Sequence, residues 1–126
     1  MQVYPRESII LVEQYEKQVN WYGEVMGFFV TKRFDEIHYC NLENAAGIKI
    51  AICVASEMEV KLRDRKSNSI VLQFAVDSVQ IFLQVVESNG GTIVCAPVLN
   101  EKDNFWFASF ADPEGNAHWI VDKNCP

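Results

Sequence analysis

Basic side chains are scarce in this sequence. Its 126 residues include 11 Lys and Arg against 17 Asp and Glu, which gives a net charge of −6 at pH 7. Nucleic acids and anionic membrane surfaces attract basic faces, so this balance argues against both as the main partner. Long apolar runs are missing too, since a membrane-spanning helix needs roughly 20 such residues, and the N-terminal MQVYPRES has no apolar signal core. We therefore expect a soluble, cytoplasmic protein with no nucleic-acid or membrane partner.

Paired cysteine motifs are also missing. The four cysteines, Cys40, Cys53, Cys95 and Cys125, form no CxxC pair, which argues against a zinc ribbon or a thioredoxin-like site. Three of them lie within or beside apolar, strand-like runs, as small buried side chains do in a reducing compartment. The sequence contains no glycine-rich phosphate loop either. The missing CxxC pair and phosphate loop argue against several common kinds of catalytic or metal site.

Apolar residues, by contrast, make up 49% of the chain, enough to build one domain around a core without disulfides. Residues 8–12 form a short apolar run that predicts a buried strand. Residues 15–26 place apolar side chains at helical spacing, and Gly27 predicts a left-handed end to that helix. Three further strand-like runs complete a β-α-β-β-β order, at 28–34, 37–42 and 47–54.

The second half repeats this plan. Residues 69–76 predict a strand, and residues 76–91 predict a helix that begins with Asp77 or Ser78 as its N-cap. Its inner face would carry Val79, Phe82, Leu83 and Val86. The later strands are expected at 92–98, where a proline ends the strand, and, on either side of the tight turn 112–115, at 105–111 and 116–122.

An offset of 64 residues superimposes the two halves. It aligns Val12 with Val76 and Gly27 with Gly91, and the later strands then need about four extra residues near 99–104. A repeat of this length indicates a duplicated βαβββ unit. We expect one domain over 1–126, with a first module at about 5–54, a linker at 55–68 and a second module at about 69–122.

The linker is charged and has no apolar stripe. Its basic cluster could bind phosphate, but such a run is more typical of a solvated connector. The cluster consists of Lys61, Arg63, Arg65 and Lys66.

Four segments of the chain form familiar motifs in a fixed order: NWYGEVMGF (20–28), VDSV before the second helix, NGGTIV after it, and FASFADPEGNAHWIVD (107–122). In register, they resemble the vicinal-oxygen-chelate (VOC) superfamily of glyoxalases, bleomycin-resistance proteins and extradiol dioxygenases. The resemblance implies an α+β fold in which two βαβββ modules form a curved eight-stranded mixed sheet, with helices outside and a ligand cleft inside. It also implies a homodimer. It implies no single activity, because the superfamily includes metal enzymes and metal-free drug-binding proteins.

The enzymes of this superfamily carry His, Gln or Glu metal ligands on the first and last strand of each half. In the first half, the aligned position on the first strand is Glu7, and the last strand, 48–54, has only Lys49 as a polar side chain. In the second half, the first strand has Val71 at the aligned position, with Gln73 on the same face. The last strand has Trp119 in place of a glutamate. His118 should point to the opposite face, although a one-residue register shift would give a ligand set of Glu7, Gln73 and His118. A catalytic metal usually needs about three protein ligands, so we predict no metal cofactor.

Aromatic residues instead predict a ligand pocket in the cleft. The expected pocket residues are Tyr39, Val71, Gln73, Phe105, Trp106 and Trp119. Acidic side chains could favour a cationic ligand, namely Glu7, Glu13, Asp35, Glu36 and Asp103. The leading hypothesis is a metal-independent protein that binds an aromatic or amphipathic molecule, for drug sequestration of the bleomycin-resistance type or for sensing. The alternatives are a metal-dependent glyoxalase- or dioxygenase-like enzyme and a non-catalytic interaction module.

Overall fold

The computed structural model describes residues 1–62 and 69–126. The chain divides into two compact units, Met1–Arg63 and Asp64–Pro126. Three members of the predicted basic cluster, Arg63, Arg65 and Lys66, lie outside the described residues. No helix among the described residues is long and apolar enough to cross a membrane.

The first unit is a four-stranded mixed sheet with one α-helix. Its elements are β1 (Ser8–Val12), α1 (Tyr15–Met26), β2 (Phe29–Phe34), β3 (Tyr39–Glu43) and β4 (Lys49–Val54), with short 3-10 turns η1 (Asp35–Ile37) and η2 (Ala55–Met58). The strand order is β1-β4-β3-β2. β1 runs parallel to β4 and the other pairs are antiparallel.

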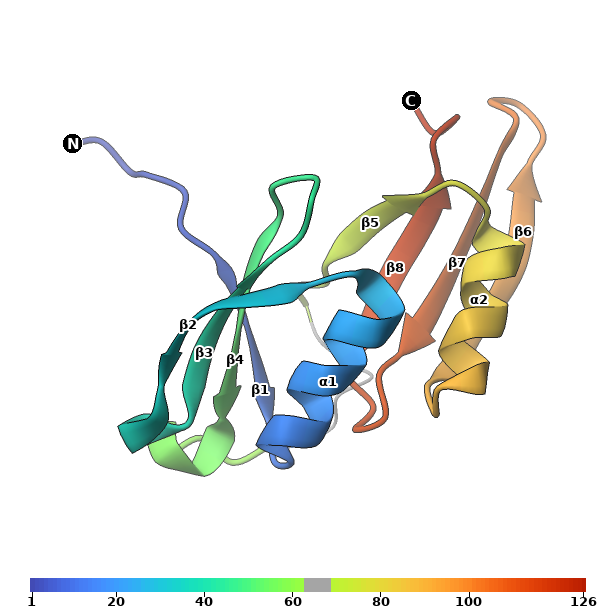
Figure 1. The fold of residues 1–126 in the computed structure, drawn as a ribbon. Helices are drawn as coiled ribbons and strands as arrows, with labels where there is room; N and C mark the ends of the chain where they lie inside the picture. The colour runs from blue at the N-terminus through green and yellow to red at the C-terminus, as the bar shows by residue number, and fades with distance from the viewer. Residues whose placement is uncertain (63–68) are drawn as a thin grey trace. The chain divides into compact units, whose positions relative to one another are not determined.

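The second unit has the same topology (Figure 1). Its elements are β5 (Gln73–Val76), α2 (Val79–Ser88), β6 (Thr92–Asn100), β7 (Phe105–Ala111) and β8 (Ala117–Asp122). The order is β5-β8-β7-β6, with β5 parallel to β8. The predicted pair of βαβββ modules is therefore confirmed, and the eight strands belong to two four-stranded sheets.

The predicted repeat extends to the strand register. Val12 pairs with Val54 in the first unit, and Val76 pairs with Asp122 in the second. Val12 and Val76 are 64 residues apart along the chain, whereas Val54 and Asp122 are 68 apart. The second unit therefore contains four additional residues between its paired strands. The long β6–β7 hairpin accommodates them.

Both helices begin or end on local signals in the sequence. Gly27 adopts φ 72°, and its backbone N–H donates to the carbonyl groups at the last turn of α1. This left-handed conformation is costly for a side chain with a Cβ, which explains glycine at this position. At α2 the Ser78 hydroxyl accepts a hydrogen bond from the backbone N–H of Ile81 at 3.2 Å, so Ser78 is the N-cap.

Several predicted strand boundaries are wrong, among them the start of β4, which begins at Lys49 and not at residue 47. β6 continues past Pro97 to Asn100, because β6 is the edge strand and its register shifts between Cys95 and Val98; an edge strand tolerates a missing N–H at such an irregularity. β3 begins at Tyr39, since the 3-10 turn before it leaves His38 at φ 44°. β5 begins only at Gln73.

The late start of β5 follows from its partner strand. Gln73 pairs with Trp119, so residues 69 and 70 would lie opposite residues 115 and 116. Those residues belong to the turn before β8, where the buried Asp112 carboxylate accepts hydrogen bonds from the backbone N–H groups of Glu114 and Asn116. The turn leaves no extended partner for residues 69 and 70, whereas the carbonyl of Leu72 still accepts a hydrogen bond from the backbone N–H of Trp119 at 2.9 Å.

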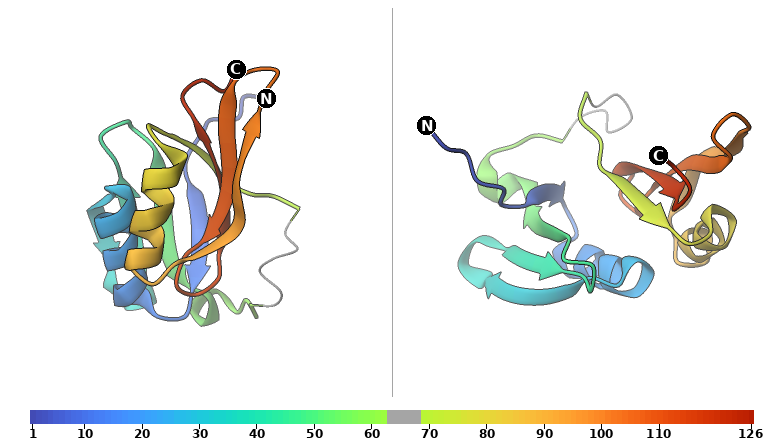
Figure 2. Two further views of the ribbon diagram at one scale, coloured as in Figure 1. Left: turned by 90° about the vertical axis from the view of Figure 1, so that its right-hand side faces the viewer. Right: turned by 90° about the horizontal axis from the view of Figure 1, so that it is seen from above.

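Each face of the second sheet has a distinct composition. α2 covers one face, as Figure 2 shows, and buried Phe74, Phe110 and Ile120 lie there. Because side chains alternate along a strand, their neighbours point to the opposite face, on which no helix lies among the described residues of this unit. We call it the helix-free face, and it carries Gln73, Phe105, Phe107, Ser109 and Trp119.

Candidate functional site

A cavity of about 390 Å³ lies on the helix-free face of the second unit. Three aromatic side chains line it: Phe105 and Phe107 from β7, and Trp119 from β8. The Phe105 and Phe107 ring centroids are 6.2 Å apart, with the rings tilted by 49°. Trp119 is 52% exposed and Phe107 is 37% exposed, so the cavity offers two large apolar surfaces to a ligand.

The polar groups of the cavity lie in one row across the sheet. Gln73 on β5 pairs with Trp119 on β8, Trp119 pairs with Ser109 on β7, and Ser109 pairs with Cys95 on β6. All four residues line the cavity. An amide and a hydroxyl therefore flank the indole ring of Trp119 on its two sides.

Sequence reasoning found part of this cavity. Of the predicted pocket residues, Gln73, Phe105 and Trp119 line it, and Val71 and Trp106 do not. Trp106 follows Phe105 on β7 and therefore points to the other face; its backbone N–H donates to Asp122 Oδ2 at 3.0 Å. Tyr39 belongs to the first unit.

Seven lining residues were missed: Cys95, Phe107, Ala108, Ser109, Ile120, Val121 and Cys125. Phe107 and Ser109 follow Phe105 at strand spacing, so period-two alternation from Phe105 could have identified both. Cys95 could have been found only from the register of β6, which contains two irregularities. Cys125 lies beyond the last strand, where no periodic signal exists.

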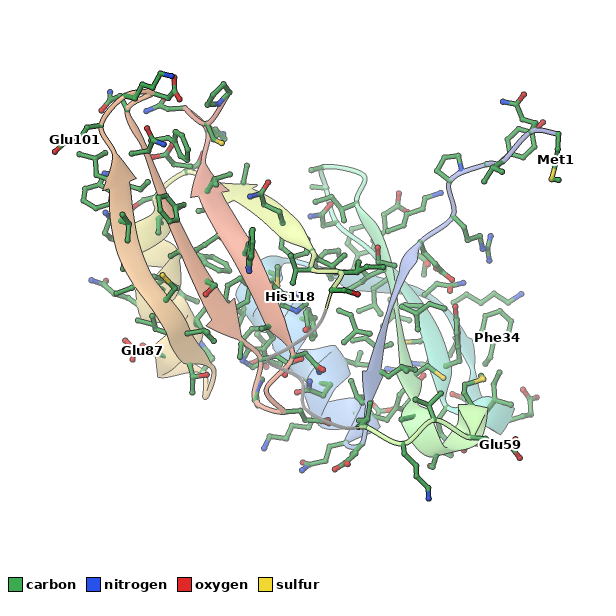
Figure 3. All side chains as sticks on the ribbon, turned by 180° about the vertical axis from the view of Figure 1, so that it is seen from behind. Met1, Phe34, Glu59, Glu87, Glu101 and His118 are labelled. Carbon is green, nitrogen blue, oxygen red and sulfur yellow. The ribbon has the colours of Figure 1, made fainter. Side chains whose placement is uncertain are left out.

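His118 lies on the face of the sheet opposite to Gln73. Figure 3 marks it on β8, and its ring is 5.8 Å from Phe74 and 5.4 Å from Phe110 between centroids. The residue is 3% exposed. Burial lowers the pKa of His118 to about 4, although the negative charge of Asp112 opposes this shift. His118 is thus a neutral core residue at pH 7 and cannot share a metal with Gln73.

Glu7, the third candidate ligand, lies in a polar cluster of the first unit. The Tyr39 hydroxyl donates to Glu7 Oε1 at 2.6 Å. The Asn41 amide nitrogen, in the orientation that satisfies its hydrogen bonds, lies 3.1 Å from Glu7 Oε2. The side chain of Glu7 is only 8% exposed. Burial, the hydrogen bond to Glu7 and the charge of Glu7 together raise the pKa of Tyr39 to about 12.

The first unit has its own cavities around this cluster. Glu7, Arg6 and Lys49 line both a cavity of about 490 Å³ and one of about 170 Å³. The Arg6 guanidinium Nε lies 4.0 Å from Glu7 Oε1. Two cations at the border of these cavities oppose the binding of a metal ion there.

The side chains at the expected metal positions do not fit a divalent ion. In the second unit the closing strand offers an indole, which has no lone pair for a metal, next to the Gln73 amide. In the first unit Glu7 already accepts hydrogen bonds, and Lys49 is cationic. Within residues 1–62 and 69–126, no three His, Cys, Asp or Glu side chains come together in a way that could hold a metal ion.

Comparison with known proteins agrees with this architecture. The family model described as "Glyoxalase/Bleomycin resistance protein/Dioxygenase superfamily" matches residues 7–120. The chain belongs to this superfamily. No curated protein matches the sequence.

Several solved structures of this superfamily and its relatives have the same fold at low sequence identity. The hypothetical protein SA1046 from S. aureus superimposes with a TM-score of 0.77 at 16% identity, covering 97% of this chain and 95% of that one. FosX, a fosfomycin resistance protein from Listeria monocytogenes, gives 0.75 at 13% identity, with 97% and 94% covered. A glyoxalase/bleomycin resistance protein/dioxygenase family enzyme from Burkholderia phytofirmans gives 0.68 at 20%, with 92% and 95% covered. At such identities these likenesses establish the fold alone.

Proposed function

We propose that this superfamily member is a small-molecule-binding protein that holds an aromatic molecule against Trp119 without a metal ion. The observation that carries the proposal is the half-exposed indole of Trp119, which lies in a cavity with Phe105 and Phe107. A cavity of about 390 Å³ falls within the usual range of small-molecule sites, roughly 300–1,000 Å³. A ring stacked on the indole would gain about 0.5–1.5 kcal/mol beyond the burial of its apolar area.

The biological role we propose is sequestration or sensing of that molecule. Drug sequestration has a parallel in the superfamily, whose description includes bleomycin resistance proteins. The family resemblance also supports a homodimer, which light scattering on the purified protein would test. Neither role requires a chemical reaction of the ligand, and neither needs a metal ion, for which the Gln73 amide and the Trp119 indole are poorly suited.

The test is a titration of the purified protein with uncharged bicyclic and tricyclic aromatic compounds, followed by calorimetry. Trp119→Leu should weaken binding at least tenfold, because it removes the largest apolar surface of the cavity. Trp106→Leu is the matched control, since it replaces a tryptophan on the opposite face of the same sheet. Equal affinity of the wild type and Trp119→Leu would refute the proposal.

The metal-dependent enzyme remains the second candidate function that the superfamily offers. It would use Glu7, Gln73 and a further ligand. Elemental analysis of protein purified without chelators distinguishes this enzyme from the metal-independent binding protein. The enzyme would be favoured if the wild type contains a stoichiometric divalent metal and if Glu7→Gln or Gln73→Leu removes it. The third candidate, an interaction module, would bind none of the aromatic compounds.

A further inference from the structure

The cavity on the helix-free face of the second unit has a polar pattern that selects a particular class of ligand. We propose that it binds an uncharged, planar ring system with hydrogen-bonding groups at opposite ends, one facing Gln73 and the other facing Ser109. This inference rests on the proposed function and specifies the ligand of the same site.

Charge is the first part of the argument. The described residues that line the cavity include no Asp, Glu, Lys, Arg or His. The five acidic residues that could have favoured a cation all lie elsewhere. An ion that leaves water for such a lining loses hydration and gains no opposite charge, so neutral molecules are favoured. The acidic composition of the whole chain therefore gives no guide to the charge of the ligand.

The spacing of the polar groups is the second part. Gln73 and Ser109 both pair with Trp119, from opposite sides. Neighbouring strands lie about 4.8 Å apart, which places the backbones of Gln73 and Ser109 roughly 10 Å apart across the indole. A flat molecule that lies on the indole would thus meet an amide at one end and a hydroxyl at the other.

The availability of these groups is the third part. Neither the Gln73 amide nor the Ser109 hydroxyl hydrogen-bonds to another side chain or backbone group of the described residues. Ser109 is 8% exposed and lines the cavity, and its hydroxyl oxygen is not among the fully buried side-chain atoms that lack a partner. Both groups are therefore open to the cavity, where a ligand group can replace water as their hydrogen-bond partner.

Naphthalene derivatives provide the test. Naphthalene-2,6-diol has one hydroxyl at each end, 2-naphthol has only one, naphthalene-2,6-dicarboxylate is an anion, and 2,6-bis(aminomethyl)naphthalene is a cation. We expect the diol to bind about fivefold more tightly than 2-naphthol, which corresponds to one hydrogen bond of about 1 kcal/mol. The two charged compounds should bind at least tenfold more weakly than the diol.

Variants then assign the two ends. Gln73→Leu or Ser109→Ala should each reduce the affinity for the diol to that for 2-naphthol. Either single change should leave 2-naphthol binding nearly unchanged, since this compound can still use the remaining group. The double variant should weaken both compounds. Gln80→Leu and Ser88→Ala replace the same residue types at exposed positions of α2 and should have no effect.

The outcomes separate this inference from the proposed function. If Trp119→Leu abolishes diol binding while Gln73→Leu and Ser109→Ala leave it unchanged, the inference is wrong and the proposed function stands. Equal or tighter binding of either charged compound would likewise overturn only the inference. If the wild type binds none of the four compounds, both are wrong.

Discussion

The hydrogen bond between Tyr39 and Glu7 gives the sharpest prediction about the stability of the first unit. Tyr39→Phe removes one hydroxyl and keeps the ring, whose edge contact with Phe34 has a centroid distance of 5.8 Å. The lost bond is short, at 2.6 Å, and its acceptor is a carboxylate whose side chain is 8% exposed. We expect the free energy of unfolding to fall at pH 7.

The magnitude follows from the surroundings of the carboxylate. Hydrogen bonds to charged groups contribute about 1.5–3 kcal/mol. Glu7 lines two cavities that water can enter and keeps the Asn41 amide as a neighbour, so a value of about 1–2 kcal/mol is expected. Urea denaturation of both proteins measures it, and Tyr4→Phe, at an exposed N-terminal tyrosine, is the control.

The same bond predicts a pH dependence. The pKa of Tyr39 is raised to about 12 in the folded protein, against an ordinary value of 10.0 for tyrosine. A raised pKa favours the protonated phenol, so its stabilising contribution is complete below pH 10 and is lost as the pH rises from 10 to 12. The stability difference between the wild type and Tyr39→Phe should therefore shrink across that window. A difference below about 0.3 kcal/mol at pH 7, well under the expected worth of the bond, would refute the reasoning.

Three further predictions concern the fold. Gly27→Ala should lower the free energy of unfolding, measured by urea denaturation, by about 1–2 kcal/mol. The reason is the φ of 72°, since no atom lies within 4 Å of the added Cβ. Gly27→Asn should lower it less, and an equal loss for both variants would argue against a conformational cause. Ser78→Ala should lower the free energy of unfolding by about 1 kcal/mol through the loss of the N-cap of α2. Ser88→Ala, near the other end of the helix, should not lower it. A lower melting temperature for Ser88→Ala than for Ser78→Ala would contradict this. Burial lowers the pKa of His118 to about 4 in the folded protein, against an ordinary value of 6.5. The unfolded chain therefore binds the proton first, and stability is lost as the pH falls from 6.5 to 4. His118→Leu should lose less stability than the wild type between pH 7.5 and 4.5, and an identical loss in urea titrations would count against a buried neutral imidazole.

The elements with strong local signals were predictable from the sequence. β1, α1 and β7 have the predicted bounds, because each combines a clear apolar period with a sharp end such as Gly27. The repeat offset was also correct down to the pairing of individual residues. Local propensity and the duplicated pattern agree in these segments, which is the condition under which sequence reasoning succeeds.

The wrong boundaries depend on partner strands. Pro97 ends a strand by local rules, but its place on the edge strand lets β6 continue. The segment 69–72 has strand propensity, but the turn around Asp112 leaves residues 69 and 70 without an extended partner. Neither fact is visible without the register.

The candidate site was only partly predictable for the same reason. Trp119 stood out because it replaces an expected glutamate, and Gln73 because it shares the face of the aligned position. The choice of both Phe105 and Trp106 ignored alternation, which allows only one of two neighbours on a strand to face the cavity. Alternation from Phe105 places Ser109 on the same face, but only the pairing of β7 with β8 shows that it lies beside Trp119.

The most direct test of the account is a crystal structure of the protein with naphthalene-2,6-diol. We predict that the ring lies over the indole of Trp119, with one hydroxyl within hydrogen-bond distance of the Gln73 amide and the other near Ser109 Oγ. Density for the diol beside Glu7 and Lys49, or anywhere other than against Trp119, would contradict the central claim.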